Sequence, residues 1–170
     1  IAADARIVDV QITCHPKQVE AILSDAPTHC TTGGNRSGKS RVLAWWLFRR
    51  WMLRGHGELA DDLAGHTTAA LFWWVSPTLR DAYQYGVELL AGRGALGGGL
   101  WPDEVFGSLP GISEHDDAPR LRLIDGSVLA FQHGHHSGGS AGDNLISANV
   151  SDAAIDEAAR IRSRETYQQI

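Results

Sequence analysis

The most informative segment of this chain is GGNRSGKS at residues 33–40. Its letters match the pattern G-x-x-x-x-G-K-[ST] at every fixed place, which is typical of a phosphate-binding loop. Glycines there let the backbone close around phosphates and turn successive N–H groups inward. The N-terminus of the helix that follows adds a partial positive charge. The stretch therefore predicts a nucleotide phosphate site built from Gly33, Gly34, Asn35, Arg36, Ser37, Gly38, Lys39 and Ser40.

Two side chains of this loop carry their own chemistry. Lys39, one of only two lysines among the 15 basic residues, supplies a compact point charge for the β- and γ-phosphates. The Ser40 hydroxyl is a hard oxygen ligand for Mg²⁺. The alternative is a glycine-rich turn that contains a lysine by accident. An extended stretch before the loop and a strong helix after it favour the phosphate site.

Working outward from the loop, hydrophobic patterning predicts alternating helices and strands. A helix over 39–54 is apolar on nearly all sides, and Gly55 is expected to cap its C-terminus. The apolar run 67–75 has the length of a central strand covered on both faces, and Asp125-Gly126 predicts a two-residue hairpin turn. Further expected helices cover 14–24, 79–91 and 158–170, an extended stretch covers 29–32, and further strands cover 120–124, 127–132 and 150–155. This alternation indicates a mainly parallel α/β domain.

Length and composition limit the class of protein. The 170 residues correspond to one domain, with 43% hydrophobic residues to fill its core. The formal net charge of −5 excludes a uniformly basic surface, so any nucleic-acid binding must be local. The longest unbroken apolar run, 69–75, is too short to span a membrane, and the N-terminus carries no signal-peptide pattern. We expect a cytoplasmic protein with no membrane partner.

A second candidate site lies at the end of the expected strand 150–155, where Asp156 and Glu157 follow directly. In an open α/β sheet ligands bind at the carboxyl ends of the strands, so this pair and the loop are expected to share one crevice. Asp156 would hold Mg²⁺ through a water, and Glu157 would orient or deprotonate the water that attacks the γ-phosphate. The alternative is an acidic pair that caps the next helix. Asp152 is a weaker candidate for the metal because it lies within the strand.

Four segments together resemble a known family. They are HPKQ at 15–18, GGNRSGKS at 33–40, WWVSPT at 73–78, and IDEAAR at 155–160 followed by a tyrosine-bearing helix. In this order they resemble the ATPase domain of the large terminase subunit, the DNA-packaging motor of tailed bacteriophages, over residues 14–170. The resemblance implies a three-layer P-loop NTPase fold. Its mainly parallel sheet would have helices on both faces and an extra strand between the loop strand and the acidic strand.

Several residue roles follow from the resemblance alone. Gln18 would pair with the amino group and N7 of adenine, unless it is a solvated helix residue. Arg36 would sense or stabilise the γ-phosphate from within the loop, so the implied catalytic residues are Glu157, Lys39 and Arg36. Four other arginines act on a neighbouring subunit or are solvated, and the sequence does not separate these alternatives: Arg41, Arg160, Arg162 and Arg164.

The resemblance also implies a function and partners. The chain, 1–170, would be one P-loop ATPase domain, truncated at its C-terminal end. It would hydrolyse ATP with Mg²⁺ to drive double-stranded DNA into a procapsid, as a ring of copies at the portal in the host cytoplasm. The portal protein and the small terminase subunit are the other implied partners. A coupling motif and a nuclease domain would follow residue 170, so the whole protein would also be an endonuclease. The alternatives are a helicase-type nucleic-acid translocase and a nucleotide-binding module with little hydrolysis.

Overall fold

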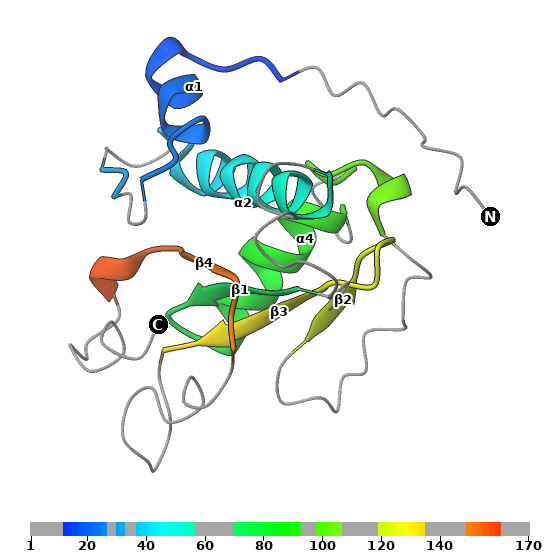
Figure 1. The fold of residues 1–170 in the computed structure, drawn as a ribbon. Coiled ribbons are helices and arrows are strands. Elements are labelled where there is room, and N and C mark those ends of the chain that lie inside the picture. The colour runs from blue at the N-terminus through cyan, green and yellow to red at the C-terminus, as the bar shows by residue number, and fades with distance from the viewer. Residues whose placement is uncertain are drawn as a thin grey trace.

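A four-stranded sheet organises the residues that the structure, a computed structural model, describes: 12–26, 30–32, 37–56, 70–92, 98–106, 119–134 and 149–160. The strands are β1 (Leu71–Ser76), β2 (Arg120–Arg122), β3 (Val128–His133) and β4 (Asp152–Ile155), in the order β2-β3-β1-β4 (Figure 1). β1 pairs in parallel with β3 and β4, whereas β2 and β3 pair antiparallel. The described chain is therefore α/β with a mixed sheet.

The apolar run of β1 occupies the middle of this sheet, between β3 and β4. Phe72 and Trp74 belong to the larger core cluster, while Trp73 and Val75 belong to a smaller one. Successive side chains of a strand point to opposite faces, so the two clusters lie on opposite faces of the sheet. All four side chains are buried, which explains why the run is continuously hydrophobic. The predicted central strand is confirmed.

The described helices that pack on the sheet lie against one face of it, and α1 (Pro16–Ile22) packs on α2 (Lys39–His56). The other described helices are α3 (Leu79–Asp81), the π-helix η2 (Ala82–Val87), α4 (Glu88–Ala91) and the 3-10 turns η3 (Asp103–Val105) and η5 (Ala158–Arg160). α2 and the run α3–η2–α4 contribute Leu47 and Leu90 to the core on the Phe72 and Trp74 face (Figure 1). Within the described ranges no helix joins the opposite cluster. Helices on both faces therefore stay a prediction.

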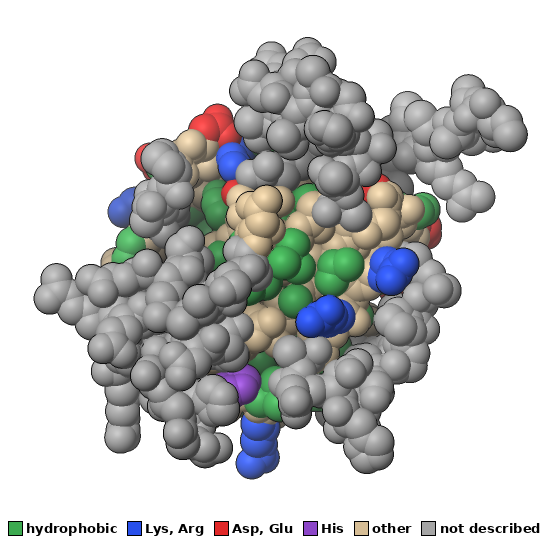
Figure 2. Space-filling model, turned by 60° about the horizontal axis from the view of Figure 1, so that its bottom comes forward, with side chains coloured by type: hydrophobic (Ala, Val, Ile, Leu, Met, Phe, Trp, Pro, Cys, Tyr) green, Lys and Arg blue, Asp and Glu red, His purple; other side chains and the backbone are tan. Residues whose placement is uncertain are grey.

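The opposite face of the sheet is also apolar. Figure 2 views the molecule from below the sheet of Figure 1, and hydrophobic side chains gather at the centre of the described surface there. Ala130, Ala153 and Ile155 join Trp73 and Val75 in this cluster. Each face of the sheet therefore carries an apolar cluster.

An aromatic layer fixes α2 to the segment that precedes η3. Trp101 stacks with Trp51 at 6.5 Å between ring centroids and with Phe106 at 6.1 Å, and its indole N–H donates to the Ala44 carbonyl at 3.1 Å. Phe48 meets Trp101 edge to face at 5.4 Å. The rings fill the core, as expected for tryptophans on buried elements.

Two helix predictions need correction. α2 continues through Gly55, so this glycine does not cap the helix. α1 is shorter than 14–24, and it does not bury the whole of its apolar side. Val19, Ile22 and Leu23 fall at helical spacing on one side, but Val19 and Leu23 are 41% and 55% exposed and Ile22 alone of the three is buried. The helix packs against α2 through its last turn, which carries Ile22.

The helix over 79–91 and the hairpin at 120–132 are confirmed, with one addition. The middle of the helix is the π-helix η2, and a Cβ on its Gly86 would lie 2.7 Å from the Phe131 ring and 2.9 Å from the Trp74 ring. Glycine therefore permits the close approach of this helix to the sheet. At the hairpin turn, Gly126 has a φ of +88°, which also favours glycine.

Some predictions lie outside the described residues. Among them are residues 33–36 of the phosphate loop and the predicted helix beyond η5, 161–170. Residues 30–32 are described and form no strand, so the loop strand has no place in the described sheet. The extra strand between it and β4 stays a prediction.

Candidate functional site

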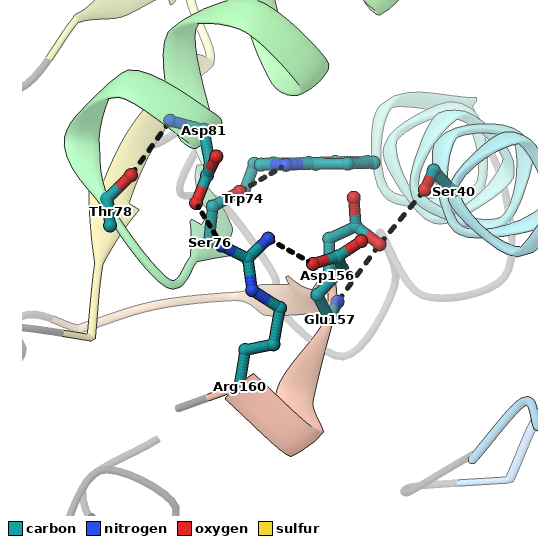
Figure 3. Close-up of polar contacts among 8 residues, drawn as sticks. All are labelled: Ser40, Trp74, Ser76, Thr78, Asp81, Asp156, Glu157 and Arg160. Carbon is teal, nitrogen blue, oxygen red and sulfur yellow. Dashed lines mark hydrogen bonds and ion pairs between the residues drawn. The ribbon is translucent and has the colours of Figure 1, made fainter. Parts of the chain in front are cut away.

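The beginning of α2 meets the end of β4 beside the end of β1. The Ser40 hydroxyl, in the first turn of α2, donates a hydrogen bond to Asp156 Oδ1 at 3.0 Å (Figure 3). At the end of β1, Trp74 Nε1–H donates to Ser76 Oγ at 3.2 Å. The structure thus brings together the second half of the phosphate loop and the acidic pair, which lie 116 residues apart.

The alternation of side chains along β4 explains why Asp156 meets Ser40 in the first turn of α2. Asp152, Ala154 and Asp156 are two residues apart, so their side chains point to the same face of the sheet. Asp152 Oδ1 accepts from Arg50 Nε of α2 at 2.8 Å, and Ala154 joins the core that α2 covers. Asp156 therefore follows on the face that already contacts α2.

The phosphate loop enters α2 through a left-handed glycine. Gly38 has a φ of +81°, and a Cβ there would lie 2.9 Å from Gln18 Nε2. The left-handed φ favours glycine at this position, because a side chain there strains the backbone. The fixed glycine of the sequence pattern therefore has a structural reason.

Gln18 contacts the loop from α1. Its Nε2 donates to the Ser37 carbonyl at 3.1 Å, and its Oε1 accepts the N–H of His15 at 2.9 Å, completing the capping box of α1. Both ends of the amide are engaged in the chain itself. The structure shows Gln18 as a link between α1 and the loop, and its predicted pairing with adenine stays a prediction.

Asp156 is a buried carboxylate whose hydrogen-bond donors are neutral. The Glu157 main-chain N–H donates to the same Oδ1 that receives the Ser40 hydroxyl, at 3.0 Å. Burial raises the pKa of Asp156 above its ordinary value, and the hydrogen bond from Ser40 opposes this only in part. The negative charge of Glu157 raises this pKa further, while Lys39 lowers it slightly. An additional cation would relieve this unbalanced charge.

Glu157 has a strained backbone and a side-chain partner. Its φ of +50° lies in the left-handed region, which non-glycine residues rarely adopt. The carboxylate accepts a hydrogen bond from Arg160 Nη1, and Arg160 Nη2 lies 3.5 Å from Asp81 Oδ2 (Figure 3). The hydrogen bond and charge of Glu157 raise the pKa of Arg160. Asp81 belongs to α3, where Thr78 Oγ1 accepts its N–H at 3.1 Å.

The remaining predicted residues divide into described and undescribed ones. Lys39 is half-buried as the first residue of α2, and Arg41 is exposed in the same turn. Arg36 and the first three residues of the loop lie outside the described ranges, as do Arg162 and Arg164. The described part of the chain holds no group of three or more His, Cys, Asp or Glu side chains placed to bind a metal. A metal at Ser40 and Asp156 would therefore need ligand oxygens from the nucleotide and water.

Sequence reasoning missed two charged contacts near the site. One is the pair between Arg50 and Asp152, whose partners lie 102 residues apart and leave no local signal. The other is the chain of contacts from Asp81 through Arg160 to Glu157. The spacing of three residues between Glu157 and Arg160 was a usable signal, because residues i and i+3 meet on a helical turn.

Comparisons with protein families, with curated proteins and with solved structures found no significant match to this chain. Within the described ranges, no helix has both the length and the apolar character that crossing a membrane requires.

Proposed function

We propose that this chain binds ATP with Mg²⁺ and hydrolyses the bond to the γ-phosphate. The observation that carries the proposal is the hydrogen bond between Ser40 and Asp156 at 3.0 Å. It joins the serine that ends a phosphate-loop pattern to a carboxylate at the end of a parallel strand, the edge at which α/β sheets bind ligands. A glycine-rich turn with an accidental lysine would have no reason to lie against this carboxylate.

The side chains fit the chemistry that this reaction needs. The Ser40 hydroxyl and the Asp156 carboxylate are hard oxygen donors, and the raised pKa of Asp156 reflects a charge that a cation would stabilise. When bound, Mg²⁺ would neutralise charge on the phosphates. Lys39 and the N–H groups at the start of α2 would bind the β- and γ-phosphates, with Arg36 beside the γ-phosphate. Glu157 would orient or deprotonate the attacking water.

The wider proposal is the ATPase domain of a phage large terminase. It rests on the four segments at 15–18, 33–40, 73–78 and 155–160 and on their order in the chain. The domain would have the three-layer P-loop fold and would act in the host cytoplasm as a homo-oligomeric ring at the procapsid portal. There it would move double-stranded DNA, together with the portal protein and the small terminase subunit. A nuclease domain would follow in the same protein.

Two substitutions test the proposed ATP site. Lys39→Ala should abolish binding of a fluorescent ATP analogue, because it removes the point charge on the phosphates. Lys17→Ala is the matched control, since Lys17 is the other lysine and lies exposed on α1. Tight binding by Lys39→Ala would overturn the assignment of the loop.

The second substitution separates hydrolysis from binding. Glu157→Gln should keep ATP affinity within about twofold and lower phosphate release about 100-fold, because positioning of the attacking water is lost. Wild-type turnover in this variant would show that Glu157 is not the catalytic base and would remove its proposed role.

A further inference from the structure

We propose that Arg160, anchored by Asp81, is a positioning residue that holds the Glu157 carboxylate of its own subunit in place for catalysis. The inference rests on the proposed ATPase function, because Glu157 needs a fixed orientation only if it acts on a water. It assigns a role to Arg160, one of the four arginines whose role the sequence leaves undecided.

Arg160 is tied to Glu157 through both its side chain and its main chain. Its Nη1 donates to Glu157 Oε2 (Figure 3). Its main-chain N–H donates to the Glu157 carbonyl at 2.8 Å. The second bond closes the 3-10 turn η5 directly after β4. The left-handed φ of Glu157, +50°, turns the chain so that residue 160 comes back over residue 157. The strained backbone and the ion pair therefore belong to one local arrangement.

Asp81 supplies the second anchor of the guanidinium. Its Oδ2 lies 3.5 Å from Arg160 Nη2, and the Asp81 side chain is only 16% exposed. This oxygen is buried and has no hydrogen-bond partner among the described residues, so the nearby guanidinium charge offsets its burial. The main chain of Asp81 is fixed in turn by the Thr78 cap at the start of α3. Asp81, in the helix that follows β1, thus fixes Arg160. Arg160 in turn fixes Glu157 after the end of β4.

The contact restricts the position of Glu157 more than it stabilises the fold. The side chains of Glu157 and Arg160 are 46% and 57% exposed, and ion pairs at such exposure contribute little to stability. Without a partner, a half-exposed glutamate samples several rotamers. A carboxylate that must orient a water gains from being held in one of them. The same guanidinium is engaged within its own chain, which argues against a role on a neighbouring subunit.

Steady-state ATP hydrolysis tests the proposal through kcat and KM separately. Arg160→Ala should lower kcat about tenfold and leave KM for ATP within about twofold, because the misplaced group acts after nucleotide binding. Arg160→Lys should recover part of the loss, since it restores the charge without the two-sided guanidinium. Asp81→Asn should lower kcat less than Arg160→Ala. Arg80→Ala, an exposed arginine next to Asp81, should behave as the wild type. Each of these variants should have the same midpoint of thermal unfolding as the wild type.

Each contrary result has one meaning. An unchanged or raised kcat in Arg160→Ala overturns the positioning role, and so does a loss that appears in KM alone. Recovery of activity on mixing Arg160→Ala with Glu157→Gln subunits would show that Arg160 acts between subunits. Failure of the proposed function is distinguishable, because the wild-type protein would then release no phosphate from ATP, or Glu157→Gln would release it at the wild-type rate. An inactive Glu157→Gln beside a fully active Arg160→Ala would remove only this inference.

Discussion

The two ends of β4 both contact α2, with different chemistry. At its start, Asp152 accepts a hydrogen bond from the guanidinium of Arg50 at 2.8 Å, and the side chains are 8% and 17% exposed. At its end, Asp156 accepts from the Ser40 hydroxyl and from a main-chain N–H, both at 3.0 Å. One carboxylate is therefore matched by a charge, and the other is bonded by neutral donors.

This difference separates a structural contact from a candidate binding site. The Arg50 and Asp152 pair is complete in itself, because a buried carboxylate beside a guanidinium has its charge compensated. Among the described residues, no guanidinium or ammonium group bonds to Asp156, and burial raises its pKa more than Ser40 and Lys39 lower it. A buried carboxylate with a raised pKa lowers the stability of the free protein, and a bound cation would restore it. The end of β4 nearer the phosphate loop is thus the end at which a cation would bind.

The two ends of β4 should differ most in their importance for activity. Asp156→Asn should lower Mg²⁺-dependent ATP hydrolysis about 100-fold, because the charge that orders the metal is removed. Asp152→Asn should keep hydrolysis within about twofold, since this carboxylate faces Arg50. Phosphate release at saturating ATP measures both rates. Equal losses in the two variants would contradict the division between the ends of β4.

For stability the order of the two carboxylates is reversed, and Asp152 matters more than Asp156. Asp152→Asn should lower the free energy of unfolding by about 2 kcal/mol, because Arg50 then keeps a largely buried charge without its partner. Urea denaturation followed by tryptophan fluorescence measures the change. A loss as small as that of an exposed ion pair would show that this end of β4 is not held by the charge pair.

A smaller gain is expected at the other end of the strand. Asp156→Asn should raise the free energy of unfolding of the nucleotide-free protein by about 1 kcal/mol. Both donors point to Oδ1, which the amide oxygen of asparagine replaces, so the hydrogen bonds survive while the buried charge disappears. Thermal unfolding without Mg²⁺ or nucleotide checks this. A destabilised variant would mean that the charge itself holds α2 against β4.

The stability gain of Asp156→Asn should also depend on pH, and this is the smallest of the expected changes. A carboxylate whose pKa is raised in the folded state binds more protons there than in the unfolded state, so its charge weakens the fold as pH rises. The advantage of Asp156→Asn should therefore be full near pH 7 and shrink on acidification through the raised pKa towards the ordinary 3.8. Urea midpoints at several pH values measure it. An advantage that is constant over this range would contradict a raised pKa.

Much of the fold could be predicted because its signals are local. The apolar run of β1 needs only its own composition to indicate a strand buried on both faces, and Asp125-Gly126 indicates the hairpin by itself. The end of α2 could not be predicted from Gly55, since a helix packed along its length continues through a poor helix former. The exposed positions of Val19 and Leu23 depend on the angle at which α1 meets α2, which no local pattern encodes.

The candidate site was predictable in its residues and less so in their contacts. The spacing of the loop pattern and the acidic pair at the end of a strand indicated that Ser40 and Asp156 would meet. The partner of Glu157 depends on its left-handed backbone, and β propensity or charge patterning does not reveal a positive φ at a glutamate. The link from Gln18 to Ser37 likewise requires α1 to lie beside the loop, a tertiary contact across 19 residues.

The span of 116 residues between Ser40 and Asp156 also bears on how this protein is made. Chains fold as they leave the ribosome from the N-terminus, and contacts between distant residues form late because closing a long loop is entropically unfavourable. α2 and β1 can emerge and pack long before β4 has been translated. A nascent chain therefore carries the phosphate loop without its carboxylates, and it acquires both in the same step that adds β4 to the sheet.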